Sequence, residues 1–157
     1  MKSKPYLKKI GVVNCTFGTN VVIIEPCNIY NANIGDNCFI GPFVEIQKGV
    51  TIGPNTRIQS HSFICELVSI GEHCFISHGV MFINDKFSIG KPADRNRSLW
   101  EKTEIGDHVS IGTNSTILPV KICNNVVIGA GSVVTRNIEE PGIFAGNPAR
   151  KIRSLSN

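Results

Sequence analysis

The 157-residue chain has a formal net charge of +4 and is 41% hydrophobic, which fits a globular protein with its own core. None of its apolar runs approaches the roughly 18 residues that a membrane-spanning helix needs. The first nine residues are basic with no apolar stretch behind them, so they do not predict a secretory signal. The mild charge suits small anionic ligands and argues against nucleic acid or a membrane as partner. We expect one domain, residues 1–157, in the cytoplasm.

Isoleucine recurs every six residues through the first half of the chain. Eight isoleucines follow one another at this spacing from Ile34 to Ile76. The register extends upstream to Phe17 and, after an interruption, downstream to Val134, with two five-residue steps. Neither an α-helix nor a simple amphipathic strand has a period of six. A parallel β-helix does, because each flat face takes about six residues before the chain turns a corner.

The residues around each aliphatic position fit the same fold. Glycine often follows the aliphatic residue, where the corner is tight and a Cβ atom is costly. The fourth residue after it is small or β-branched, and Cys27, Cys38 and Cys74 hold this position as small hydrophobes. No Cys-x-x-Cys pair occurs, so the cysteines predict neither a disulfide framework nor a zinc site. The pattern predicts an all-β fold, a parallel β-helix of about six to seven coils with a repeat body over residues 10–139.

Two segments depart from the repeat. Residues 83–104 break the register and carry the single Trp100 and five basic residues. We assign them to a loop ejected from the β-helix, and its composition favours a functional role. Residues 140–157 form the predicted C-terminal cap, in which Pro and Gly end the strand pattern, and we expect residues 149–155 to form a short helix or an extended cap over the last coil.

The repeat resembles that of the hexapeptide-repeat acyltransferase superfamily. Residues 146–150, Gly-Asn-Pro-Ala-Arg, match the superfamily's C-terminal signature, and residues 128–135 are typical of members that bind acetyl-coenzyme A. The resemblance implies a left-handed β-helix, a homotrimer, and acetyl-coenzyme A as co-substrate without a metal. Glycines would let the coenzyme approach the backbone, and basic side chains would pair with its phosphates. The residues that we predict to bind the coenzyme are Gly112, Thr113, Ala130, Gly131, Arg136, Asn147, Pro148, Arg150 and Lys151.

The middle of the chain narrows the resemblance. Residues 59–66 and 78–87 are similar to the 3-N-acetyltransferases of dTDP-3-amino-3,6-dideoxyhexoses, and less closely to enzymes that acetylate a UDP-linked 3-amino-glucuronate. In these families the Asn of a Phe-x-Asn step lies at the reacting centre, which maps onto Asn84. The resemblance implies acetylation of a nucleotide-linked amino sugar, without a strong protein base, in the synthesis of surface-polysaccharide precursors. The residues that we predict to contact the sugar are His61, Glu66, Asp85 and Lys86.

Several alternatives stay open. His78 is the second candidate catalytic residue, because other branches of the superfamily use a His to deprotonate a hydroxyl acceptor. The γ-class carbonic anhydrases share the β-helix and bind zinc through three His. Two of those ligands are five residues apart, as His73 and His78 are, but Asn37 stands where the third should lie. A non-catalytic scaffold is a further possibility, and the sequence does not decide between a dTDP and a UDP acceptor.

Overall fold

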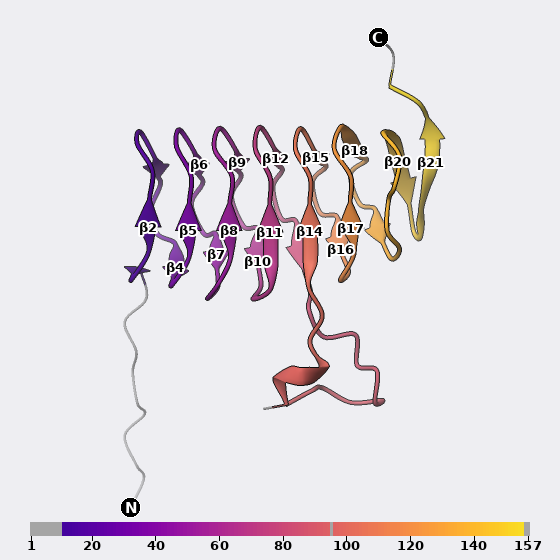
Figure 1. Cartoon of the computed structure of the whole chain (residues 1–157), viewed down its shortest axis with the longest axis horizontal. Coiled ribbons are helices and arrows are strands. Elements are labelled where there is room, and N and C mark those ends of the chain that lie inside the picture. The colour runs from indigo at the N-terminus through magenta and orange to yellow at the C-terminus, as the bar shows by residue number, and fades with distance from the viewer. Residues whose placement is uncertain (1–10, 95, 156–157) are drawn as a thin grey trace, which may run out of the picture.

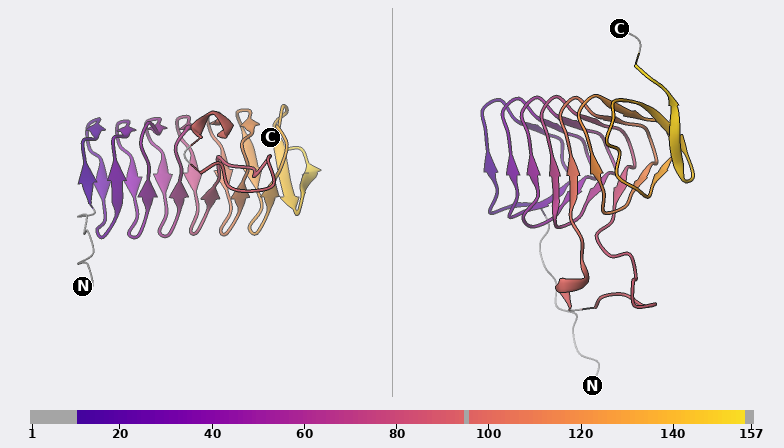
Figure 2. Two further views of the ribbon diagram at one scale, coloured as in Figure 1. Left: turned by 90° about the horizontal axis from the view of Figure 1, so that it is seen from below. Right: turned by 45° about the vertical axis from the view of Figure 1, so that its right-hand side comes forward.

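The computed structural model describes residues 11–94 and 96–155, which form a left-handed parallel β-helix (Figure 1). Very short strands follow one another around three flat faces, so the molecule is a three-sided prism (Figure 2). Each face is one sheet, which we call sheet A, B or C in the order in which the chain visits them. The predicted fold class is therefore confirmed.

The strands of the three sheets pair coil upon coil. Sheet A contains β1 (Val12–Val13), β4 (Asn28–Tyr30), β7 (Glu45–Ile46), β10 (Phe63–Ile64), β13 (Met81–Phe82), β16 (Thr116–Ile117) and β19 (Val133–Val134). Sheet B contains β2 (Thr16–Phe17), β5 (Asn33–Ile34), β8 (Thr51–Ile52), β11 (Val68–Ile70), β14 (Thr103–Ile105) and β17 (Lys121–Ile122). Sheet C contains β3 (Val22–Ile23), β6 (Phe39–Ile40), β9 (Arg57–Ile58), β12 (Phe75–Ile76), β15 (Ser110–Ile111), β18 (Val126–Ile128), β20 (Gly142–Gly146) and β21 (Ala149–Arg153).

The isoleucine column forms the core, as predicted. Ile40, Ile58 and Ile76 lie above one another in sheet C with no solvent exposure, and the other two sheets hold equivalent columns. Each buried isoleucine stabilises the stack by about 1.5–3 kcal/mol relative to an exposed one. The small position after each corner is buried as well, including Cys38 and Cys74. The core is thus built from identical layers, each of which is covered only by its neighbours.

The three corners of the prism differ in whether the number of residues between successive inward positions is constant from coil to coil. At the corner between sheets B and C (the BC corner) and at the corner between sheets C and A (the CA corner), inward residues are six apart in every coil. The corner between sheets A and B (the AB corner) takes the five-residue steps Ile29–Ile34 and Ile117–Ile122. It also takes the ejected loop between β13 and β14. All the irregularity of the repeat is therefore concentrated at the AB corner.

The corner glycines are needed because neighbouring coils approach closely. A Cβ atom on Gly53 would lie 2.5 Å from the carbonyl carbon of Gly71 in the next coil. Two residues later the chain adopts the left-handed conformation, with φ +54° at Asn37 and +58° at both Asn55 and Asn114. Asn tolerates this conformation better than other residues with a side chain. At the corners, Gly therefore allows the close approach of the next coil, and Asn two residues later adopts the left-handed conformation.

The two segments outside the repeat lie at different places on the prism. The ejected loop projects from the AB corner (Figure 1), contains the short 3₁₀-helix η1 (Arg97–Leu99), and ends two residues earlier than predicted, because Thr103 and Glu104 already belong to β14. At the C-terminal end, β20 pairs parallel to β18, and β21 returns antiparallel. Of the two forms expected for this segment, the extended one is observed. No helix among the described residues is long and apolar enough to cross a membrane.

Candidate functional site

Asn84 and Glu66 meet at the base of the ejected loop. Asn84 follows β13, Glu66 follows β10 one coil below, and the Asn84 Nδ2 group donates a hydrogen bond of 3.2 Å to the Glu66 carbonyl oxygen. The Asn84 carbonyl oxygen itself accepts from the amide of Glu101, where the loop returns. The side-chain Oδ1 of Asn84 has no hydrogen-bond partner among the described residues. Asn84 is therefore held on two sides and presents one free acceptor atom.

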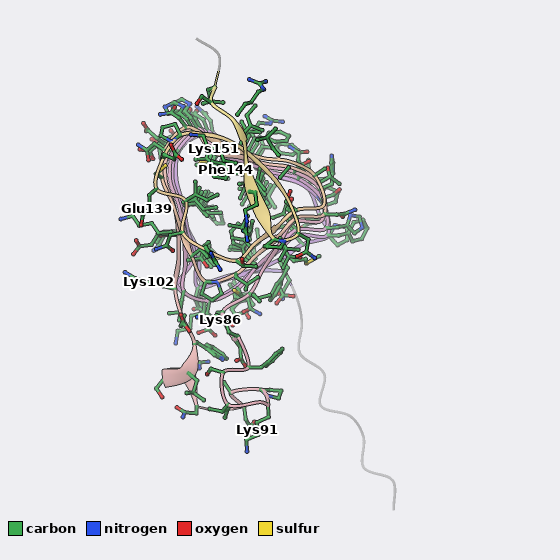
Figure 3. All side chains as sticks on the ribbon, turned by 90° about the vertical axis from the view of Figure 1, so that its right-hand side faces the viewer. Lys86, Lys91, Lys102, Glu139, Phe144 and Lys151 are labelled. Carbon is green, nitrogen blue, oxygen red and sulfur yellow. The ribbon has the colours of Figure 1, made fainter. Side chains whose placement is uncertain are left out.

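Asp85 and Lys86 hold the loop in shape. Both carboxylate oxygens of Asp85 accept backbone hydrogen bonds, from Phe87 at 2.8 Å and from Ala93 at 2.7 Å. The Lys86 ammonium, in the outgoing part of the loop, lies 2.7 Å from the carboxylate of Glu101, in the returning part. In Figure 3, Lys86 lies where the loop leaves the prism, whereas Lys91 lies at its far end. In this structure, the side chains of two predicted sugar contacts, Asp85 and Lys86, are engaged within the loop.

His78 and the predicted glycine-rich residues line the CA corner. His78, Thr113 and Ala130 occupy the same position in three successive coils, two residues after the inward isoleucine. The His78 Nδ1 atom is hydrogen-bonded to the Ser60 hydroxyl at 2.9 Å, so the Nε2 atom is the ring nitrogen that remains available to a ligand. His61 lies at the same corner one coil below and stacks on Phe43 with ring centroids 4.9 Å apart.

The backbone amides of Gly112 and Thr113, two of the predicted coenzyme-binding residues, differ in whether they are free to donate to a ligand. The Gly112 amide donates to the Ile128 carbonyl oxygen at 2.8 Å, so it is used in the coil-to-coil ladder. The amides of Thr113 and Ala130 have no hydrogen-bond partner among the described residues. Free amides suit a developing negative charge, because they donate without reorganisation. The structure thus favours Thr113 over Gly112 as a donor.

Three of the predicted basic residues surround a hollow at the C-terminal end of the prism. Arg136, Arg150 and Lys151 line it together, and its volume is about 220 Å³. Phe144 and Lys151 lie over the end of the β-helix in Figure 3. Lys151 pairs with Glu140 at 2.7 Å. Beside this hollow, the β20–β21 turn with Asn147 and Pro148 continues the CA corner, since the Gly146 amide donates to the Ser132 hydroxyl at 3.1 Å.

Apart from the basic residues at the C-terminal end, the predicted site residues form two groups within one chain. His61, His78, Thr113 and their neighbours lie at the CA corner, and Asn84 and Glu66 lie at the AB corner. Sheet A separates the two groups, because β13 runs from one corner to the other between His78 and Asn84. The six residues from His78 to Asn84 span at most about 20 Å when extended.

Four residues without a predicted role lie around Glu66, namely Tyr30, Glu45, Gln47 and Arg97. Gln47 accepts from the Glu66 amide at 3.3 Å, and its side-chain amide donates to Glu45 at 2.9 Å. The Arg97 guanidinium lies 3.3 Å from the Glu66 carboxylate. Burial and the charges of Glu45 and Glu66 raise the pKa of Tyr30, while Arg97 lowers it. Gln47 lies 19 residues before Glu66, so the 18-residue coil period indicates that it is near Glu66 without indicating the contact, and no period connects Arg97 to Glu66.

The histidine spacing considered for zinc does not bring ligands together within the chain. His73 lies at the BC corner and stacks on His108, whereas His78 lies at the CA corner, and β12 runs between them. Among the described residues, no group of three His, Cys, Asp or Glu side chains is placed to hold a metal ion.

Comparison with known families matches two parts of the chain. Residues 31–66 match the family described as Bacterial transferase hexapeptide (six repeats). Residues 102–136 match the hexapeptide repeat of succinyl-transferase. Both matches fall on the repeat body.

Curated relatives include the bifunctional protein GlmU of Clostridium beijerinckii, which is 35% identical over 141 residues and 82% of this chain. GlmU of Dichelobacter nodosus is 33% identical over 133 residues and 80% of this chain. The chain spans only 30% and 28% of the length of these two relatives.

Solved structures share the fold over nearly the whole chain. A variant of AntD, an N-acyltransferase from Bacillus cereus solved with dTDP and coenzyme A, is 27% identical, with a TM-score of 0.66 over 94% of this chain and 85% of that one. A galactoside acetyltransferase in complex with coenzyme A is 31% identical, with a TM-score of 0.67 over 78% of this chain and 64% of that one. A hexapeptide transferase family protein from Anaplasma phagocytophilum, 18% identical with a TM-score of 0.73 over 92% of this chain and 83% of that one, supports the fold alone. In repeat and in fold, the chain is similar to bacterial hexapeptide-repeat acyltransferases.

Proposed function

We propose that the chain is an acetyl-coenzyme A-dependent N-acetyltransferase that acts on the 3-amino group of a dTDP-linked 3-amino-3,6-dideoxyhexose. The observation that carries the proposal is the position of Asn84 at the base of the ejected loop. Its Nδ2 group is anchored to the Glu66 carbonyl oxygen, and its Oδ1 atom has no hydrogen-bond partner among the described residues. The likeness to AntD, solved with dTDP and coenzyme A, supports the classes of acceptor and co-substrate. The proposed setting is the cytoplasmic synthesis of surface-polysaccharide precursors.

Asn84 would orient the acceptor without removing a proton. Its Oδ1 atom accepts a hydrogen bond from an amine N–H and so directs the nitrogen lone pair toward the thioester. An amine with a pKa near 8 is partly neutral at physiological pH and needs no strong base. Acetyl-coenzyme A supplies the thioester, and its thiolate leaving group takes the proton that the amine loses. The Thr113 amide would donate to the oxyanion formed when the amine attacks.

The separation of the two groups across sheet A supports a homotrimer with shared sites. The CA corner of one subunit would then face the Asn84 loop of its neighbour. Apolar side chains are exposed on both sheets that meet at the CA corner and at the corner itself, with Phe75 39%, Met81 40% and Phe43 57% exposed. A closed threefold arrangement would cover these side chains.

Complementation between inactive variants tests the shared site. Asn84→Ala and Ala130→Trp, whose bulky side chain would block the predicted coenzyme site, impair different corners, so trimers mixed from the two variants would contain some intact sites if each site is shared. We expect activity to return after the two inactive proteins are dissociated and reassembled together. Mixed trimers that stay as inactive as the parents would contradict a site between subunits.

A panel of acceptors tests the reaction. Coenzyme A release would be followed with a thiol reagent, using dTDP- and UDP-linked 3-amino sugars, serine and a simple alcohol. Turnover confined to an amino sugar and reduced at least about a hundredfold in Asn84→Ala, as expected for a positioning group, would support the proposal. His108→Ala, at the BC corner, serves as the matched control and should remain active. Absence of turnover and of acetyl-coenzyme A binding would reject the enzyme and favour a scaffold.

One observation favours a second candidate, an O-acetyltransferase. The Ser60 hydroxyl fixes the His78 ring and leaves Nε2 for a hydroxyl acceptor, as general-base catalysis requires. Turnover of the alcohol, lost in His78→Ala and kept in Asn84→Ala, would identify this reaction.

A further inference from the structure

An acidic cluster lies at the AB corner around Glu66. Glu45 and Glu66 are joined through Gln47, whose side chain bonds to the Glu45 carboxylate and to the Glu66 amide. The Glu66 side chain is only 15% exposed, and Tyr30 lies within the field of both carboxylates. We call Tyr30, Glu45, Gln47 and Glu66 the Glu66 cluster. Asn84 is attached to it through the Glu66 carbonyl oxygen.

Arg97 supplies the positive charge that faces this cluster. Its Nη1 atom lies 3.3 Å from the Glu66 Oε2 atom, and its guanidinium lies 5.4 Å from the centre of the Trp100 ring. Arg97 begins η1, and the Asn96 side chain caps this helix by accepting from the Ser98 amide. The other charged pair at the loop base, Lys86 and Glu101, is internally neutral. Arg97 therefore reaches Glu66 only because the loop folds back onto the AB corner.

These charges bear on the acceptor that Asn84 would orient. A carboxylate beside a bound amine stabilises its protonated form, which has no lone pair to attack a thioester. A nearby guanidinium has the opposite effect, because like charges disfavour protonation. Resting on the proposed function, we infer that Arg97 is a positioning residue that neutralises Glu66 and so keeps the acceptor's amino group neutral and nucleophilic.

The pH dependence of kcat tests this role, because it reports ionisations in the enzyme–substrate complex. With a dTDP-linked 3-amino sugar, Arg97→Gln should move the acidic limb of the profile upward by about one pH unit. This corresponds to a roughly tenfold loss of kcat at low pH and little loss at high pH. Arg97→Lys keeps the charge and should restore most of the wild-type limb. The double variant Arg97→Gln/Glu66→Gln should return the limb toward wild type, because the carboxylate that Arg97 neutralised is gone.

Proton exchange on binding gives an independent readout. Calorimetric titration of the amino sugar into the enzyme with coenzyme A, in two buffers of different ionisation enthalpy, should show proton release near pH 7. Arg97→Gln should reduce that release. Lys91→Gln, at the exposed end of the loop, is the matched control and should behave as wild type in both measurements.

The outcomes separate the two proposals. Lack of turnover with every amino sugar would reject the proposed function. Turnover with an unmoved acidic limb in Arg97→Gln, and unchanged proton release, would leave that function intact and reject the role of Arg97. A loss of kcat that is equal at all pH values would likewise reduce Arg97 to a structural contact of the loop.

Discussion

The Asn84 side chain donates a hydrogen bond to the backbone carbonyl oxygen of Glu66, 3.2 Å away in the neighbouring coil. The bond orients the amide group, because only Nδ2 can donate to a carbonyl oxygen. It thereby determines that Oδ1 is the atom open to a ligand. The contact ties the start of the ejected loop to the regular β-helix.

Replacing Asn84 with Asp removes this donor and places a carboxylate against the Glu66 carbonyl oxygen. We expect Asn84→Asp to destabilise the loop anchor by about 1 kcal/mol, at the low end of the cost of an unsatisfied polar group, because Asn84 and Glu66 are only partly buried. Limited proteolysis within residues 86–94 should become faster, whereas Asn33→Asp in sheet B should leave that rate unchanged. An unchanged rate in Asn84→Asp would show that the bond does not hold the loop.

The isoleucine columns should dominate stability. Ile76 is fully buried, so Ile76→Ala leaves a cavity between two coils and should lower the free energy of unfolding by about 2–5 kcal/mol. Ile89, 51% exposed in the loop, provides the matched control, and Ile89→Ala should change stability by less than about 0.5 kcal/mol. Urea unfolding followed by circular dichroism measures both. Similar losses in the two variants would contradict the layered core.

Glycine positions should differ according to the approach of the next coil. In Gly53→Ala the new methyl group meets the Gly71 backbone at 2.5 Å, which only a backbone shift can relieve. At Gly49, with φ +79°, nothing lies within 4 Å of the added Cβ atom, so Gly49→Ala carries only the backbone strain of about 1–2 kcal/mol. Thermal unfolding should therefore show a larger loss of Tm for Gly53→Ala. The reverse order would contradict the close coil contact.

The basic hollow at the C-terminal end should contribute to coenzyme binding. Arg136→Gln or Arg150→Gln should each raise the Kd of coenzyme A about three- to tenfold, since both side chains are exposed and screened by solvent. Calorimetric titration measures the change. Lys121→Gln, which removes the same charge on the outer side of sheet B, should leave Kd unaltered. Equal effects of all three substitutions would point to net charge alone.

The buried thiols should make the protein less stable at high pH. Burial, with a smaller contribution from the charge of Glu66, raises the pKa of Cys65 from 9.0 to about 12. A raised pKa in the folded state gives stability that is complete below about pH 9 and is lost as the pH rises toward 12. We expect urea midpoints to fall between pH 8.5 and 10.5, and to fall less steeply in Cys65→Ala. Parallel slopes in the two proteins would show that Cys65 does not ionise on unfolding in this range.

Much of the fold was predictable because the repeat is local. The burial of Ile40, Ile58 and Ile76 follows from their spacing, since each coil repeats the same sequence of inward and outward side chains. The grouping of Thr113 with Ala130 follows from the same period. The hydrogen bond of the Gly112 amide follows the period as well, because it donates to the Ile128 carbonyl oxygen in the next coil as Gly53 donates to Ile70.

The six-residue spacing by itself determined the β-helix, the inward columns, the place of the loop and the grouping at each corner. The spacing predicts nothing about the structure of the chain where it leaves the repeat. The pairing of Arg97 with Glu66 joins residues about 30 positions apart, and it depends on the path by which residues 83–102 fold back. Likewise, the ion pair of Lys86 with Glu101 depends on that path. Only the tertiary structure decided these features, because contacts of the loop follow no period.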